Sequence, residues 1–474
     1  MRVRDYGCRS FPIISTTLLV ACGGGGYSAP YMPPPPPPAM PTVSFTAPTQ
    51  STTLNFGRTV KLTWTSTSAT SCSASTSTNT GGSFSGSEPL TGSATVAPTA
   101  PGNVTYTLTC MGTGGSASAT TSVTVNASIL STLSVAGITT IGSTIDPVSA
   151  DYNPYGLALA PATAGLITQG DLVVCNFNAG MQTQQGTGTT LVGLHPSAGA
   201  TPYRIAQSAH LQGCNALTML PDDSISAAAY MSNENPLVTA AGVVNTPFSS
   251  DTFASPWGEA YVAANGTNPA ALYVSNVDGS IDRITLNGDA QSAFTVIATG
   301  FCFSGSPGAI YAPSGLTYDA SIDTLYIVDT SSNSVVAFAG VSAIGSGGIV
   351  VNGQCSSVMA PPTPAPTFTG TSAASARVIA TGGALFTPLS AALLSDGDLI
   401  VANADINIGS QTPNQVFEIS PELPGGFVGA PLQLDSGAPG ALFGMIATVD
   451  GQGKQIVYFN DDNANAVMKI TVGP

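Results

Sequence analysis

Short runs in which apolar and polar residues alternate follow one another along most of the chain, and glycine, serine, threonine or proline separates them. In residues 60–64 and 106–110 every second residue is apolar. A period of two is typical of strands with one buried face, whereas the 3.6-residue period of a helix is nearly absent. The pattern therefore predicts an all-β protein.

One strand pattern recurs six times between residues 128 and 474. Each copy has a first strand of the Gly-Leu-Ala-Leu-Ala type, as in residues 156–160, and a second strand that ends near Asn or Asp. The second strands begin at residues 171, 224, 271, 324, 398 and 455. This spacing fits four-stranded blades and predicts a six-bladed β-propeller. Residues 129–142 are expected to supply the outer strand of the last blade and so close the ring.

The fourth copy resembles a known repeat. It reads Pro313-Ser-Gly-Leu-Thr-Tyr-Asp319 and then Leu325-Tyr-Ile-Val-Asp329, which resembles the NHL repeat of six-bladed propellers. Copies one, three, five and six follow this sequence more loosely, and copy two matches it least. The resemblance implies that ligands bind at the mouth of a central channel.

Residues 42–127 form a separate strand-rich region that resembles an immunoglobulin-like sandwich. The resemblance rests on Trp64, Cys72, Tyr106 and Cys110, and it implies that these residues lie in a core between two sheets. Cys72 follows Trp64, whereas antibody domains place the first cysteine before the tryptophan. We therefore expect the bridge to join different strands from those in antibodies. A passive stalk and an adhesive module are both open functions for this region.

The first 21 residues have the features of an export signal. Arg2, Arg4 and Arg9 precede an uncharged stretch, residues 11–20, that is too short to span a bilayer as a helix. The sequence Leu19-Val20-Ala21-Cys22 and the four glycines after it resemble the lipobox of bacterial lipoproteins. The family implies cleavage before Cys22 and acylation of its thiol, for example with palmitate. We predict an extracytoplasmic protein of the cell envelope, anchored to an outer membrane or the cell surface, with residues 22–41 as a Gly- and Pro-rich tether.

The charge of the chain excludes one class of partner. The leader carries three of the 10 basic residues and one of the 25 acidic residues, so the rest of the chain has 7 and 24, a formal charge of −17. Such a surface repels phosphate backbones, so no nucleic-acid partner is expected. The membrane is expected to be a partner only through the lipid.

Six cysteines remain once Cys8 is cleaved off and Cys22 carries the lipid. An even number in an exported chain favours disulfides. Fifteen pairings are open, and the domain boundaries favour three bridges: Cys72–Cys110, Cys175–Cys214 and Cys302–Cys355. A Cys/His zinc site is not expected, because the spacings do not fit and only His195 and His210 are present.

The ends of the second strands supply the candidate ligand-binding residues. They are Asn176, Asn276, Asp329, Asn403 and Asn460. Asn178, Asp278 and Asp405 lie close to these ends and extend the set. A ring of oxygen atoms suits calcium or a sugar, and Asp461 and Asp462 are the candidate metal ligands. The alternative is that Asn and Asp bond the local backbone at strand ends.

Three functions follow from this set. The preferred one is a lipid-anchored propeller that binds a protein, a glycan or another ligand, with no cofactor required. The second is a metal-dependent hydrolase that resembles gluconolactonase-like lactonases and uses Glu259, Asp329 and Asn403. The third is a structural surface protein. The sequence has no Gly-x-Ser-x-Gly motif of a serine nucleophile, and His195 and His210 are expected in or beside loops. Tyr155 and Trp257 are expected either to stack on a carbohydrate or to pack between blades.

Overall fold

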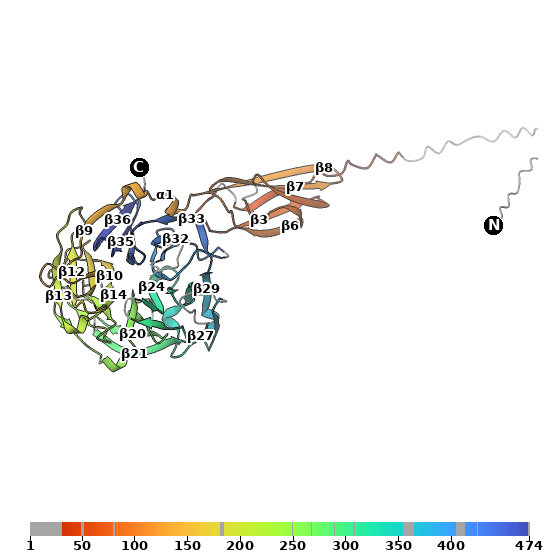
Figure 1. The fold of residues 1–474 in the computed structure, drawn as a ribbon. Helices are drawn as coiled ribbons and strands as arrows, with labels where there is room; N and C mark the ends of the chain where they lie inside the picture. Colours follow the sequence, from red (N-terminus) through yellow and green to blue (C-terminus); the bar gives the residue numbers. More distant parts are fainter. Residues whose placement is uncertain are drawn as a thin grey trace, which may run out of the picture.

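Strands make up nearly all of the regular structure, as the alternating pattern predicts (Figure 1). The computed structural model describes residues 31–472 except 49–51, 79–80, 83, 181–183, 249, 267, 289, 307–308, 354–364, 404–412 and 424. In these residues helical structure is limited to α1 (Ile129–Thr132) and five 3-10 turns, η1 (Val135–Gly137), η2 (Ala209–Leu211), η3 (Ser250–Thr252), η4 (Val341–Ala343) and η5 (Ala373–Ser375). None of the described helices is long and apolar enough to cross a membrane. The predicted lipidation residue, Cys22, lies outside the described residues.

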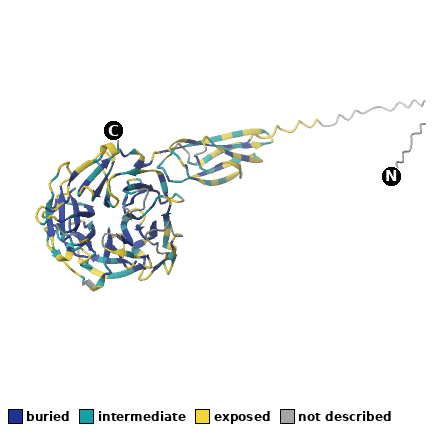
Figure 2. Ribbon diagram, in the orientation of Figure 1, coloured by how far each residue is buried: buried dark blue, intermediate teal, exposed yellow. Residues whose placement is uncertain are grey.

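The N-terminal strands form two sheets that share one core. One sheet has the order β1-β3-β6 and the other has the order β2-β8-β7-β4-β5. Trp64, Phe84 and Tyr106 are fully buried between them and make edge-to-face ring contacts. Buried positions lie along strands of both the N-terminal sheets and the C-terminal ring (Figure 2). The strands are β1 (Thr42–Ala47), β2 (Thr52–Leu54), β3 (Val60–Thr67), β4 (Ser71–Thr76), β5 (Gly86–Glu88), β6 (Thr91–Val96), β7 (Gly102–Gly112) and β8 (Gly115–Val125).

Six antiparallel blades follow and surround a central channel, so the prediction of a six-bladed β-propeller is confirmed. Blades one and two are β10 (Tyr152–Leu159), β11 (Leu172–Asn178), β12 (Thr190–Leu194) and β13 (Tyr203–Gln207), then β14 (Cys214–Met219), β15 (Ile225–Ala229), β16 (Leu237–Val238) and β17 (Val244–Asn245). Blades three and four are β18 (Pro256–Val262), β19 (Ala271–Asn276), β20 (Ile281–Asn287) and β21 (Ala290–Thr299), then β24 (Pro313–Asp319), β25 (Thr324–Asp329), β26 (Ser334–Ala339) and β29 (Ala376–Thr381).

Blades five and six are β30 (Pro388–Leu393), β31 (Leu399–Asn403), β32 (Gln415–Ile419) and β33 (Phe427–Gln433), then β34 (Leu442–Val449), β35 (Gln455–Asp461), β36 (Ala466–Thr471) and β9 (Thr139–Ser143). Two short strands, β27 (Ile349–Asn352) and β28 (Thr367–Thr369), extend the sheet of blade three, and β22 (Ser304–Ser306) pairs with β23 (Ala309–Tyr311).

The ring closes by pairing the two ends of the propeller sequence. Strand β9 pairs with β36, so the last blade contains a strand from the start of the propeller, as predicted. Only residues 139–143 form this strand. Residues 129–132 form α1 instead, because Ser128 caps the helix and the Glu418 carboxylate accepts hydrogen bonds from the backbone N–H groups of Ile129 and Leu130.

Two of the three predicted disulfides are confirmed. Cys72 and Cys110 are register partners on β4 and β7, so this bridge lies within one sheet. Cys175 on β11 is bonded to Cys214 on β14 and joins blade one to blade two. Cys302 is disulfide-bonded, and its predicted partner Cys355 lies outside the described residues.

Candidate functional site

A β-bulge displaces the first strand of every blade near its start. The register against the second strand shifts at equivalent places in β10, β14, β18, β24, β30 and β34. Bulges re-aim the side chains beside them, and here one such residue from each blade borders the channel. These six residues are Tyr155, Asn215, Trp257, Ser314, Leu389 and Phe443.

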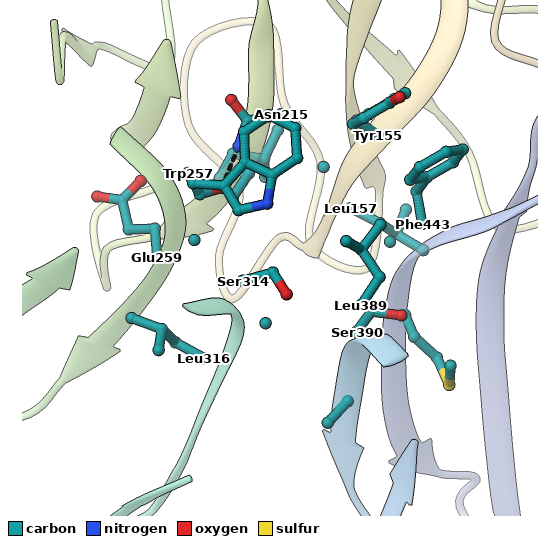
Figure 3. Close-up of a pocket in the computed structure, with 18 residues that line it drawn as sticks. Tyr155, Leu157, Asn215, Trp257, Glu259, Ser314, Leu316, Leu389, Ser390 and Phe443 are labelled. Carbon is teal, nitrogen blue, oxygen red and sulfur yellow. Dashed lines mark hydrogen bonds between the residues drawn. The ribbon is translucent and has the colours of Figure 1, made fainter. Parts of the chain in front are cut away.

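The six side chains border a cavity in the central channel (Figure 3). The next residue of each first strand is small; this second ring is Gly156, Ala216, Gly258, Gly315, Ser390 and Gly444. The third ring is Leu157, Leu217, Glu259, Leu316, Ala391 and Met445. The third ring also borders a second cavity, so the two cavities adjoin along the channel.

The second ring is small because neighbouring first strands approach each other there. A Cβ atom on Gly258 would lie 1.6 Å from the Ser314 carbonyl oxygen, and one on Gly444 would lie 2.4 Å from the Tyr155 carbonyl oxygen. Real Cβ atoms do not come this close to a backbone oxygen. Glycine at these positions therefore permits the inner strands to meet at the channel.

Side chains of one blade hold the inner strand of the next. The Asn460 amide donates to the carbonyl oxygens of Tyr155 (3.0 Å) and Gly156 (3.2 Å), which joins blade six to blade one. The Asn215 amide donates to the Trp257 carbonyl, and the Thr330 hydroxyl donates to the Pro388 carbonyl. These bonds satisfy backbone carbonyls at or beside the bulges.

Aromatic side chains pack together at the start of the first strands. The Tyr155 ring stacks on Phe443, with centroids 3.8 Å apart, and on Phe177, with centroids 4.3 Å apart. Trp257 meets Tyr155 and Tyr230 edge to face. Tyr155 and Trp257 are only 4% and 5% exposed. Of the two expected roles for these rings, the structure shows packing between blades.

Glu259 is the only charged side chain among the described residues that line either cavity. It is 6% exposed, and its Oε1 accepts a hydrogen bond of 3.1 Å from the Asn235 amide. Burial raises the pKa of Glu259 to about 7, although hydrogen bonds from Ser226 and Asn235 act in the opposite direction. Glu259 therefore changes charge near neutral pH.

Three buried polar atoms of the lining residues have no hydrogen-bond partner. They are Glu259 Oε2, Asn215 Oδ1 and Ser390 Oγ, from blades three, two and five. Buried polar atoms are nearly always paired in native proteins, and an unpaired one costs about 1–3 kcal/mol. These atoms belong to polar residues in the channel wall and have no hydrogen-bond partner within the protein.

The predicted ligand-binding residues at the ends of the second strands are buried and bonded within the protein. Asn176 donates to the Thr144 carbonyl, Asn403 donates to the Ala384 carbonyl, and Asp329 accepts from Ser331 and Ser332. Asn276 donates to Ser280 and Asp282, and Asn460 joins blades six and one. None of the five borders either cavity. The alternative of backbone and inter-blade bonding is present at these positions, and ligand binding there stays a prediction.

The two predicted metal ligands lie at the end of β35 and directly after it. Asp461 accepts a hydrogen bond from the Ala464 backbone. Burial, together with the charge of Asp461, raises the pKa of Asp462 to about 7. Among the described residues, neither belongs to a group of three acidic, His or Cys side chains close enough to share an ion. A metal at this pair stays a prediction.

The predicted hydrolase residues are not assembled in the channel. Glu259 borders both cavities, but Asp329 and Asn403 border neither. Of the residues extending the candidate set, Asn178 bonds to Gln185 and Gly186, Asp278 caps the turn before Ser280, and Asp405 lies outside the described residues.

One acidic cluster was not predicted. Carboxylate oxygens of Asp396, Asp398 and Glu418 lie within 4.8 Å of one another in blade five. Two signals in the sequence point to it: Asp396-Gly-Asp398 just before a second strand, and Glu418 at a buried position of Val416-Phe-Glu-Ile419.

Both histidines lie at strand or turn ends and are paired with carboxylates. The His195 Nδ1 atom is 2.6 Å from Asp171 Oδ1, and the His210 Nδ1 atom is 2.6 Å from Glu234 Oε2. Both imidazoles are more than half exposed. This agrees with their expected surface positions.

The fold and the channel define the class: an all-β protein that ends in a closed six-bladed propeller. No protein-family model matches the chain, and neither does any curated protein. Solved structures that match include a Staphylococcus aureus virginiamycin B lyase bound to quinupristin, with 14% identity over 68% of this chain and 96% of the lyase and a TM-score of 0.38. A Xanthomonas campestris gluconolactonase matches with 14% identity over 70% of this chain and 89% of its own, and a TM-score of 0.44. A Bacteroides thetaiotaomicron protein of unknown function matches with 10% identity over 89% and 96%, and a TM-score of 0.43. Likeness at this level assigns no activity.

Proposed function

We propose that this chain is a lipid-anchored protein of the cell envelope whose propeller binds a small ligand in its central channel. The observation that supports the ligand site is a channel cavity whose wall includes the polar residues Glu259, Asn215 and Ser390, each with a buried atom that has no hydrogen-bond partner in the protein. Pockets with mostly apolar walls and a few converging polar groups are typical of small-molecule sites.

The chemistry of the walls restricts the ligand. The third ring is apolar except for Glu259, and the residues beyond it in the second cavity are uncharged. A ligand with an apolar body and an N–H, O–H or ammonium group satisfies this lining, because carboxylate and amide oxygens accept hydrogen bonds. An anionic ligand is disfavoured by the Glu259 carboxylate. The channel rim is also the surface that the anchored propeller would offer to a protein or glycan.

Tryptophan fluorescence tests the channel. The sequence has two tryptophans: Trp257 borders the cavity, and Trp64 is fully buried in the sandwich. In a Trp64→Phe variant of the full chain, benzylamine and benzyl alcohol should change Trp257 emission with dissociation constants on the order of 1 mM, as expected for fragments. Benzoate should have a much weaker effect.

Two variants are the controls for this titration. Trp257→Phe should abolish the response, since Trp64 lies outside the propeller. Glu259→Gln should weaken the binding of benzylamine more than the binding of benzyl alcohol. If none of the three compounds changes Trp257 emission up to solubility, the channel does not bind ligands of this class.

The lipid anchor is the second part of the proposal. Its support is the sequence around Cys22 together with the described part of the tether, residues 31–40, which is exposed and has no regular structure. Cys22→Ser should move the protein from the membrane fraction to the soluble fraction and remove the acyl mass from its N-terminal peptide. A serine variant that stays in the membrane fraction would contradict the anchor.

A hydrolase is the second candidate function. The observation that favours it is Glu259, a buried carboxyl beside both cavities whose pKa is raised to about 7, where proton transfer at neutral pH is efficient. Turnover of lactones and esters, measured with and without a chelator, tests this role. Activity that Glu259→Gln abolishes would favour the enzyme over simple binding.

A further inference from the structure

Three carboxylates meet where the sandwich contacts blade five. Asp396 and Asp398 lie in the turn between β30 and β31, and Glu418 lies on β32. One oxygen from each lies within 4.8 Å of the others, so all three can contact a single ion. Every donor is a hard oxygen atom, which is the ligand type of calcium.

One guanidinium compensates part of this charge. Arg58 Nη2, from the loop between β2 and β3, lies 2.9 Å from Asp398 Oδ1 and donates to the Asp396 carbonyl at 2.8 Å. Arg58 Nη1 lies 3.4 Å from Glu422 Oε1. Asp396, Asp398 and Glu422 thus share one basic side chain, and the described ion pairs include no base at Glu418.

Two buried polar side chains beside Arg58 lack hydrogen-bond partners. Asp398 is 0% exposed, and neither of its carboxylate oxygens accepts a hydrogen bond; the Arg58 ion pair contacts Oδ1 and leaves Oδ2 without a partner. The neighbouring Ser420 hydroxyl donates to the Gly57 carbonyl at 3.3 Å, and its interaction with Asp398 lowers the pKa of that carboxyl against the larger effect of burial. Tyr326 is 1% exposed, its hydroxyl has no hydrogen-bond partner, and the residue lines a groove together with Arg58 and Asp396.

Such burial is costly without a further cation. A carboxylate removed from water is retained in native proteins when it is paired or binds a metal. The groove gives an ion a route from solvent to Asp396. We infer that Asp396, Asp398 and Glu418 hold a divalent cation of the calcium type, which acts with Arg58 to fix the sandwich on blade five.

Protonation is the competing way to compensate these groups. Burial raises the pKa of Asp398 to about 7 and the pKa of Glu418 to about 8. The two explanations differ in one measurable respect: a site compensated by protons does not respond to calcium.

Blade two provides a matched control. Its equivalent turn has the same geometry: Asp222 Oδ1 accepts from Ser224 N at 3.0 Å, as Asp396 Oδ1 accepts from Asp398 N at 3.1 Å. Ser224 stands where blade five has Asp398. Asp398→Ser therefore places in blade five a residue that this turn already accepts, and it removes a buried charge without disturbing the backbone.

The test is calcium titration of the full chain near pH 7.5, by calorimetry and by thermal unfolding. We expect one ion per chain, with a dissociation constant on the order of 0.1–1 mM, the range of low-affinity calcium modules, and an increase in Tm with calcium. Asp398→Ser and Asp396→Asn should weaken binding at least about tenfold and lose the increase in Tm. Asp222→Asn should behave as wild type.

Two results would overturn the inference. One is a wild-type chain whose heat and Tm do not change with calcium. The other is calcium binding that Asp398→Ser and Asp396→Asn leave unchanged, because the ion would then lie elsewhere. The Tm of Asp398→Ser without calcium shows that this variant is folded.

Discussion

Glu259 occupies a position that is apolar in the other five blades. The equivalent residues are Leu157, Leu217, Leu316, Ala391 and Met445. A carboxylate in such a ring is kept partly protonated near neutral pH because desolvation opposes its charge. Replacing Glu259 by glutamine is therefore expected to raise the stability of the folded chain and to weaken ligand binding in the channel.

Glu259→Gln should change how stability depends on pH. The pKa of this group is 4.5 in its unperturbed state and about 7 in the folded chain. Between these values the folded chain keeps a proton that the unfolded chain has released, so stability falls as pH rises and then stays constant above about 7. Glutamine cannot ionise, so the free energy of unfolding of the variant does not fall in this way. Relative to wild type it should rise by about 3 kcal/mol as the pH increases through this range.

Urea unfolding at several pH values from about 4 to about 9 measures this difference. Glu88→Gln, at a sandwich position away from the channel, is the control and should follow wild type. A Glu259→Gln variant whose advantage does not grow with pH would show that Glu259 is ionised in the folded state at neutral pH.

Asn and Asp at strand ends were harder to interpret from sequence than the strands themselves. Asn176, Asn403 and Asn460 each lie at the predicted place, at the end of a second strand. The amide of Asn460 reaches the first strand of blade one, more than 300 residues earlier in the chain. The hydrogen-bond partner of Asn460 is brought to it only when the ring closes. The sequence of one strand therefore does not show whether the amide at its end faces a ligand or a backbone carbonyl.

At the scale of elements, the repeated bulge explains the Gly or other small residue in each first strand. Gly258 lies directly after the bulge of β18, and its backbone N–H is held at 2.9 Å by the Ser275 hydroxyl. This contact and the Ser314 carbonyl leave no space for a side chain. The small residue is needed for packing between blades three and four.

Gly258→Ala should therefore destabilise the propeller. The added Cβ would force β18 and β24 apart, because a backbone carbonyl cannot move as a flexible side chain can. We expect a loss of about 2 kcal/mol or more, measured by urea unfolding with Trp257 as the probe.

Gly451→Ala is the matched substitution, since a Cβ there meets nothing within 4 Å. It should change stability by less than about 0.5 kcal/mol. Equal losses for the two variants would mean that glycine is required for some reason other than the close approach of strands.

At the scale of the whole molecule, the sandwich is held against blade five. The N-terminal strands lie beside β32 and β33 (Figure 1). Arg58 reaches Asp398, the Ser420 hydroxyl donates to the Gly57 carbonyl, and the backbone N–H groups of Ile129 and Leu130 in α1 donate to Glu418. Because these contacts couple the two parts, we expect them to unfold together in the wild type.

Arg58→Ala should separate the two unfolding transitions. Trp64 reports the sandwich in a Trp257→Phe background, and Trp257 reports the propeller in a Trp64→Phe background. Loss of the ion pair should lower the Trp64 midpoint by about 4–8 °C, which corresponds to about 1 kcal/mol for a domain of this size. Lys61→Ala, an exposed base on β3, should leave the transitions coincident. Separate transitions already in the wild type would contradict the coupling.

The sequence alone predicted the all-β class, the six blades and a closing strand from the start of the propeller, because alternation, repeat spacing and domain order are local or periodic properties. Among fifteen open cysteine pairings it favoured Cys72 with Cys110 and Cys175 with Cys214. It did not predict that residues 129–132 would be helical, since the Glu418 contact that holds the start of this helix comes from another blade.

The tertiary structure alone decided which polar atoms share a cavity and which carboxylates converge. Glu259, Asn215 and Ser390 lie on three blades, and Asp398 meets Arg58 across 340 residues. Such sites form only when the ring closes and the sandwich docks, because burial and proximity, not residue type, give these groups their chemistry.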